Sequence, residues 1–223
     1  MAFLGREPTK SPLVTSDLPD NAVTLAKMTG GTDGQIITYD ASGDPVAVGP
    51  GTDGQVLTST GAGSPPAFEG FPAGHIIQIV QDADDTAATS SDDTWLTAIS
   101  LDITTSNATN KILAIGTARG ELDRSAALSQ GGIRMESSSS GTDQTVNHNI
   151  GGSGAEPYGL TGYGRWSFSY TMTYIFEPDY QGAVTITMKG RRHNSNSVLY
   201  INRAGTDPNN TFSQLLLMEV VAT

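Results

Sequence analysis

The feature that most constrains the fold is a strict two-residue alternation across residues 165–176. Every second position there is aromatic or apolar, at Trp166, Phe168, Tyr170, Met172, Tyr174 and Phe176. Serine and threonine occupy most of the positions between them. Because successive side chains of a strand point to opposite faces, this pattern predicts a long strand with one buried aromatic face and one polar face.

Shorter stretches of the same kind follow the rest of the C-terminal part. Residues 184–189 alternate between apolar side chains and Thr or Lys. Further strands are predicted at residues 75–80, 111–117, 198–201 and 215–221, and weaker ones at 94–98, 132–136 and 145–149. Turns rich in Gly, Asn, Asp and Ser separate them, and no long helix is indicated. We therefore predict an all-β fold with a jelly-roll-like β-sandwich head at residues 73–223, long enough to bury its own core.

An internal repeat precedes this head. The segment GTDGQIIT at residues 31–38 returns as GTDGQVLT at residues 51–58, a period of 20 residues. Each unit has a Gly/Asp turn, a short strand, a second Gly-containing turn, and then Pro with an apolar pair. Such a unit is too short to bury its own apolar side chains, and with only two copies the missing neighbours must come from other chains.

We therefore predict that residues 29–72 form a short intertwined β stalk, most simply of three chains around an axis. The apolar side chains expected to meet in this homotrimer are Ile36, Ile37, Val56, Leu57 and Phe68. Residues 1–28 are too short to fold alone. They are either a disordered tail or an extended anchor that orders on a partner surface, with one or two helical turns at residues 21–28. The expected anchor residues are Phe3, Leu4, Leu13, Val14 and Leu18.

Charge and composition exclude several classes of function. The net charge is -11, with 12 basic and 23 acidic residues, so the basic footprint of a nucleic-acid-binding protein is missing. The chain has no cysteine, which excludes disulfides, thiolate nucleophiles and cysteine metal sites. It also lacks the long apolar run of a transmembrane helix, so we expect no membrane insertion.

Catalytic and ligand-binding motifs are weak. Residues 49–54 fit the letters of G-x-G-x-x-G, but a strand-like segment follows where a nucleotide site needs a helix. The histidines His75, His148 and His193 lack metal-ligand spacing, although one per chain near a trimer axis could hold an ion. The acidic turns at residues 82–85 and 92–93 are oxygen donors that suit calcium, with turn capping as the simpler interpretation.

Glycosidic cleavage is the one enzymatic activity that the acidic residues suggest. Four carboxylates could supply a pair for glycosidic cleavage if two of them met, namely Glu136, Glu156, Glu177 and Asp179. No nucleophile elbow is present. We expect a protein that is not an enzyme, with no catalytic residue, no cofactor and no metal site.

Two sets of residues are candidates for contact with partners. Tyr158 and Tyr163 lie in or beside the glycine-rich residues 151–164, where rings suit sugar stacking. The alternative is that Tyr163 and Trp166 form the rim and the core of the strand that follows. Arginines suit interface ion pairs, so Arg191, Arg192 and Arg203 are candidates for pairs between subunits or for contact with acidic glycans.

Several motifs resemble those of one kind of protein. GTDGQVLTSTGAGSPPAFEG resembles the glycine-rich repeats that precede the head domain of bacteriophage fibre proteins, and LPDNAVTLAKM is similar to segments of such fibres. MAFLGREPT resembles the opening of tail-associated proteins of marine and cyanobacterial phages. The head resembles C-terminal phage head domains at residues 74–80, 105–113, 200–203 and 217–220.

The resemblance implies a short homotrimeric fibre on a virion, assembled in the host cytoplasm, with heads similar to trimeric jelly rolls of the tumour-necrosis-factor type. Its expected partners are itself, a tail adaptor, baseplate or major capsid protein, and a host-surface glycan. A long N-terminal adaptor domain, common in tail fibres of short-tailed phages, is missing from the residues before the stalk. A capsid decoration, cement or head-fibre protein is therefore the main alternative, and a glycan-cleaving tailspike is a weaker one.

Overall fold

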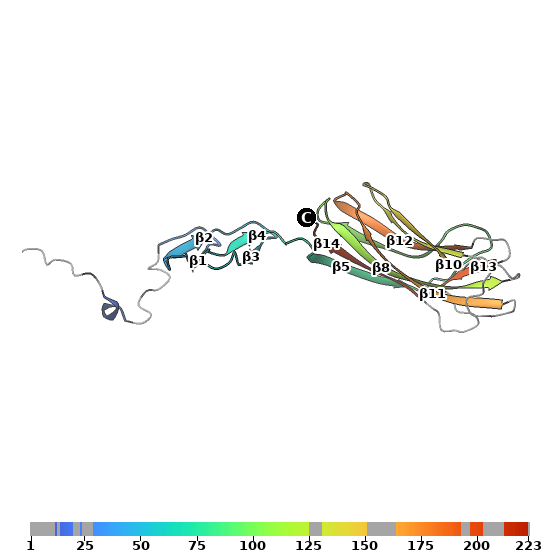
Figure 1. Ribbon diagram of the computed structural model, residues 1–223, viewed down its shortest axis with the longest axis horizontal. Helices are drawn as coiled ribbons and strands as arrows, with labels where there is room; N and C mark the ends of the chain where they lie inside the picture. Colours follow the sequence, from blue (N-terminus) through green and yellow to red (C-terminus); the bar gives the residue numbers. More distant parts are fainter. Residues whose placement is uncertain are drawn as a thin grey trace, which may run out of the picture. The chain divides into compact units, whose positions relative to one another are not determined.

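The computed structural model describes residues 12, 14–19, 23, 29–124, 131–150, 164–192, 197–202 and 212–222. The chain separates into two compact units, residues 1–70 and 71–223. The first unit contains a short 3-10 helix, η1 (Thr15–Asp17), and two hairpins. The first hairpin pairs β1 (Ile36–Tyr39) with β2 (Pro45–Val48), and the second pairs β3 (Val56–Thr58) with β4 (Ala67–Glu69) (Figure 1).

The repeated sequence Thr-Asp-Gly-Gln builds the same turn at the start of both hairpins. The amides of Gln35 and Gln55 donate to the carbonyls of Thr32 and Thr52, each at 3.1 Å. In return, the Gln Oε1 atoms accept from the Thr amides, each at 2.7 Å. Gly34 and Gly54 have φ of 76° and 82° at the third turn position, where a type II turn requires a positive φ. The identical motif therefore fixes the entry into each hairpin through local bonds alone.

The described part of the second unit contains ten strands. They are β5 (Ile76–Asp84), β6 (Ala88–Ser90), β7 (Leu96–Thr105), β8 (Lys111–Arg124), β9 (Gly131–Ser138), β10 (Thr145–Ile150), β11 (Gly164–Phe176), β12 (Gly182–Arg192), β13 (Ser197–Ile201) and β14 (Ser213–Val220). Every strand predicted from the alternation is present, several of them longer than predicted. The short strand β6 was not predicted.

The ten strands form two antiparallel sheets. One has the order β10-β9-β12-β7. In the other, β8 pairs along one side with β11 and along the other with β14 and β13, which in turn pair with β5 and β6. When β5 with β6 and β13 with β14 are each counted as one interrupted strand, this is the eight-strand, double Greek-key connectivity of a jelly roll. The all-β sandwich is therefore the observed fold.

The core lies between the two sheets. Its largest fully buried side chains come from both layers and include Ile99, Met135, Ile186 and Met188 from one sheet and Ile112, Phe176 and Leu215 from the other. In β11 the prediction of a continuous buried aromatic face was only partly right. Phe168, Met172 and Phe176 are buried, but Tyr174 is 36% exposed. Among the described strands, β11 pairs with β8 alone, so its side chains have a neighbouring strand on one flank only. The side chain of Trp166 lies outside the described residues.

Two buried polar networks contain residues of the motifs that carry the resemblance. The carboxylate Oε1 of Glu219 accepts from the Ser106 amide at 2.6 Å, the Ser106 hydroxyl at 2.8 Å and Asn110 Nδ2 at 2.7 Å. Asn202, fully buried with φ of 56°, donates to the carbonyls of Ala98 and Thr86 and accepts from the Ser213 hydroxyl at 2.5 Å. These motif residues therefore fasten loops and strands of the sandwich together.

Candidate interaction surfaces

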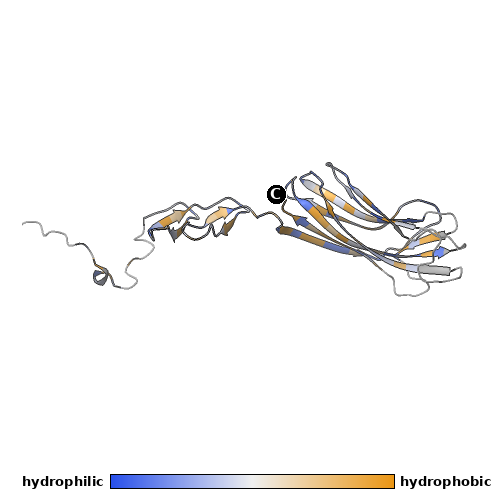
Figure 2. Ribbon diagram, viewed as in Figure 1, coloured by the Kyte–Doolittle hydropathy of each residue, from blue (hydrophilic) through white to orange (hydrophobic). Residues whose placement is uncertain are grey.

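The stalk hairpins leave their apolar side chains exposed, as the repeat length predicts. Among the described residues up to Gly70, not one is buried. Of the predicted stalk residues, Ile37 is 59% exposed, Leu57 is 46% exposed and Ile36 is also exposed, while Val56 and Phe68 are half-buried. Tyr39, which the sequence analysis did not select, is 67% exposed. Figure 2 shows orange segments along these strands.

The predicted anchor is described only in part. Val14 and Leu18 are exposed on either side of η1, where the Val14 amide donates to Asp17 Oδ2 at 2.9 Å. Phe3, Leu4 and Leu13 lie outside the described residues, as do the helical turns predicted within residues 21–28 apart from Val23. The possible glycan contacts Tyr158 and Tyr163 also lie outside them.

A cluster around Trp95 was missed by the sequence analysis. The guanidinium carbons of Arg134 and Arg191 lie 4.4 and 4.7 Å from the centroid of the Trp95 ring, within cation–π range. Glu136 pairs with Arg134 at 2.7 Å and with Lys189. These residues lie on three different strands or loops, so only the sheet register, which no local pattern reports, brings them together. Arg191, a candidate for contact between subunits or with acidic glycans, thus contacts the Trp95 ring of its own chain.

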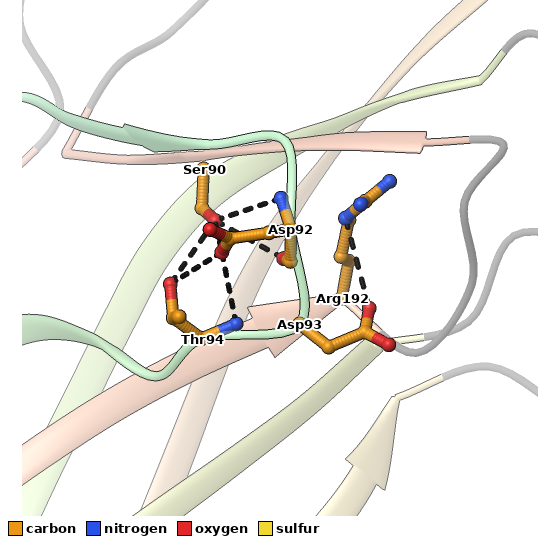
Figure 3. Close-up of polar contacts among 5 residues, drawn as sticks. All are labelled: Ser90, Asp92, Asp93, Thr94 and Arg192. Atoms are coloured by element: carbon orange, nitrogen blue, oxygen red, sulfur yellow. Dashed lines mark hydrogen bonds and ion pairs between the residues drawn. The ribbon is translucent and has the colours of Figure 1, made fainter.

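The loop that leads into Trp95 is organised by Asp92 (Figure 3). Its Oδ1 accepts from the Ser90 hydroxyl at 2.7 Å, the Thr94 hydroxyl at 2.6 Å and the Thr94 amide at 3.0 Å. These bonds, first the one from Ser90 and then those from Thr94, lower the pKa of Asp92 from 3.8 to about 2, with a smaller contribution from the charge of Arg192. The neighbouring Asp93 faces Arg192, with Oδ1 and Nε 3.7 Å apart. Asp92 therefore caps a turn, which favours the simpler interpretation of this acidic pair.

The lowered pKa gives a pH-dependent prediction. A carboxyl group whose pKa is lower in the folded state stabilises the fold above its unfolded pKa and loses that contribution as pH falls. We expect Asp92→Asn to lower the melting temperature at about pH 6, with the difference from wild type shrinking between about pH 4 and pH 2. Melting curves across this range test it, with Asp85→Asn as a control for the change in net charge. A difference that is constant with pH would contradict the assignment.

The remaining candidate motifs have structural roles or remain scattered. The first acidic segment was predicted as a turn, but Asp82 and Asp84 lie in strand β5, where they accept from the amides of Ala83 and Thr86. In the described part of the chain, no three His, Cys, Asp or Glu side chains gather as metal ligands would. The glycine motif at residues 49–54 leads into strand β3, and Glu177 forms an ion pair with Lys111. Glu156, His193 and Arg203 lie outside the described residues.

Comparison with known proteins identifies no family for this chain. No protein-family model matches the sequence, and no curated protein matches it. Among solved structures, the VP2 subviral particle of infectious bursal disease virus is 14% identical, with a TM-score of 0.30 over 76% of this chain and 43% of that chain. The Gx strain of the same virus gives 14% identity and a TM-score of 0.31, over 81% of this chain and 44% of that chain.

This chain therefore spans less than half the length of the chains it resembles. Likeness at this level establishes neither a shared fold nor a shared function, and the jelly-roll assignment rests on the strand order itself. Within the described residues, no helix is both long and apolar enough to cross a membrane.

Proposed function

We propose that the chain is a structural virion protein of a bacteriophage, a homotrimeric tail or tail-associated fibre that displays jelly-roll heads for attachment to a host-surface glycan. The observation that carries the proposal is the stalk, where two repeated hairpins have defined turns and registers but no buried residue. The phage-fibre resemblance of the same repeat supports it. No catalytic role is assigned to the chain.

The energetics of the stalk favour association. Isolated two-stranded hairpins are marginally stable in water, and these have strands of only three or four residues. Fully burying a side chain such as Ile or Leu contributes roughly 1.5–3 kcal/mol. Three chains that share Ile37, Leu57 and their neighbours around an axis would bury several such side chains per chain. A trimer thus supplies the core that a single chain lacks.

Display of three heads would serve attachment through multivalency. Contacts with a repeated glycan that are individually weak gain strength when several heads on one stalk bind together. The same stalk and head would also suit a capsid decoration, cement or head-fibre protein projecting from the shell. Imaging of assembled particles separates the two: a few copies at the tail support the fibre, and many copies over the shell support decoration.

The trimer is tested by mass. We expect the wild-type chain to sediment as three times 23.3 kDa, about 70 kDa, and to remain so on dilution. Ile37→Glu combined with Leu57→Glu should dissociate it, because carboxylates would then have to be buried in the shared apolar contacts. Ser42→Glu combined with Ser64→Glu adds the same charge at exposed turns and should leave the trimer intact. A monomeric wild type, or equal behaviour of the two variants, would refute the stalk model.

A further inference from the structure

The outer face of the β5-β14-β8-β11 sheet carries a continuous uncharged surface. Directly opposed residues of antiparallel strands point to the same side of a sheet, so the register defines rows across it. Three rows of four residues each, twelve in all, follow from the pairing. They are Ile79, Met218, Leu113 and Ile175; Gln81, Leu216, Ile115 and Thr173; and Ala83, Gln214, Thr117 and Thr171. We call these twelve residues the neutral face.

The first row of the neutral face is entirely apolar. At its two ends, Ile79 is 59% exposed and Ile175 is 51% exposed, although both belong to a head that has a well-packed core elsewhere. The central Met218 and Leu113 are half-buried by their neighbours. A shallow hollow lies over the next two rows. It is lined by Gln81, Asp82, Ala83, Ile115, Thr117, Gln214, Leu215 and Leu216, so it includes one carboxylate, Asp82, that is not among the twelve residues. Figure 2 shows orange segments along β5 and β8.

The charged side chains nearest the neutral face stand along its edges, and Asp82 lies in the edge strand β5 between Gln81 and Ala83. Lys111 and Glu177 form an ion pair beyond its first row, and Arg119 stacks on Phe212, 5.4 Å from the ring centroid, beyond its third. The outer face of the opposite sheet differs sharply, since it carries Arg134, Glu136 and Lys189. One face of the sandwich therefore has the composition of an interface centre, where charged residues are depleted, and the other that of an ordinary surface.

Net charge indicates which partner the neutral face fits. Each chain carries -11, so two copies repel one another wherever their acidic surfaces approach. When two copies meet through their neutral faces, the twelve residues of each face bring no charge into the contact, so the repulsion is smallest there. The contact also buries apolar surface, which favours association. A strongly basic partner, by contrast, would find no complementary acidic side chain among these twelve residues. A second copy of this chain is thus the occupant that the charge pattern favours.

The short link between stalk and head also favours a second copy of this chain as the partner. Strand β4 of the stalk ends at Glu69, and β5, the edge of the neutral face, begins at Ile76. Residues 70–75 join them, and a link of this length spans at most roughly 25 Å. Chains held together through their stalks would therefore hold the β5 strands of their heads within reach of one another.

We infer that the neutral face of each head packs against neighbouring copies of the same chain, so that the heads form part of the subunit interface and are not free lobes on a trimeric stalk. This inference rests on the proposed function, since the stalk is what brings the copies together.

Thiol labelling tests this inference directly, because the chain has no cysteine of its own. Ile79→Cys and Ile175→Cys place single thiols on the neutral face at positions that are exposed in one chain. Thr104→Cys places one at an exposed position of the opposite sheet. In the full-length protein at trimer-forming concentration, we expect a maleimide to modify the first two thiols at least tenfold more slowly than the third.

Mass and labelling are separate readouts, so the two possible failures are distinguishable. A trimer in which all three thiols react at similar rates would overturn the inference and leave the proposed function standing. A wild-type monomer would overturn the proposed function, and equal labelling in that monomer would overturn the inference as well. As a second variant, Ile175→Glu should raise the concentration at which the trimer dissociates by at least tenfold, whereas Thr104→Glu should not. Equal dissociation of these two variants would also count against the inference.

Discussion

Glu219→Ala is expected to destabilise the head by about 3 kcal/mol, since hydrogen bonds to a charged group contribute about 1.5–3 kcal/mol and a buried donor that loses its partner costs further free energy. Glu219 is 1% exposed, and its Oε1 accepts from both donors of Ser106 and from Asn110 Nδ2. Asn110 is itself buried, so after truncation its amide cannot turn to bulk water. Urea unfolding of the full chain, followed by tryptophan fluorescence, measures the loss.

Two further variants separate the network from a general effect of losing an acid. Glu219→Gln retains an oxygen acceptor and should cost about half as much as alanine, because only the charge is lost. Glu177→Ala removes an acid whose ion pair with Lys111 is exposed, and such pairs contribute about 0–1 kcal/mol. If Glu219→Ala and Glu177→Ala unfold at the same urea concentration, the buried network does not stabilise the head.

The sequence predicts the strands of the head well because their signal is local. A strand with one buried face has apolar side chains at alternate positions, and Phe168 and Met172 belong to such a series in β11. This pattern identifies a strand whichever strand it pairs with. The pairing itself is not local, so the contact of Trp95 with Arg134 and Arg191 could not be predicted from these residues. The same holds for the neutral face, whose rows exist only once four strands are in register.

In the predicted stalk, the sequence repeat predicts the turns but not the strand register. Identical Thr-Asp-Gly-Gln segments make identical turns, yet the two hairpins differ in register. Thr38 pairs with Val46, but its counterpart Thr58 pairs with Ala67 and not with the equivalent Pro66. The second hairpin therefore pairs one residue further along, and Pro66 lies just outside its ladder. The exposure of Ile37 and Leu57 was predictable, because it follows from unit length alone.

Gly120→Ala is expected to be a strongly damaging single-methyl change in the head. A Cβ at this position would lie 2.1 Å from the backbone carbonyl oxygen of Tyr200 and 2.9 Å from Phe168 Cζ. A backbone oxygen cannot rotate away, so β13 would have to move from β8, and the ladder pairs Tyr200–Glu121 and Ile201–Gly120 would open. Overpacking of this kind costs typically 1–3 kcal/mol and more when backbone must shift, so we expect a loss of about 3 kcal/mol or more.

Two other glycines provide matched controls for the same substitution. At Gly116 of the same strand, the nearest atoms to a new Cβ are Met188 Sδ, Leu215 Cδ1 and Met135 Cε, which are ends of flexible side chains. Gly116→Ala should therefore cost less than Gly120→Ala, while Gly49→Ala, with nothing within 4 Å, should change stability by less than about 0.5 kcal/mol. Urea midpoints in the order Gly49→Ala, Gly116→Ala, Gly120→Ala, from highest to lowest, would support the close approach of β13 to β8. Equal midpoints for the last two would show that β13 yields as readily as a methionine side chain.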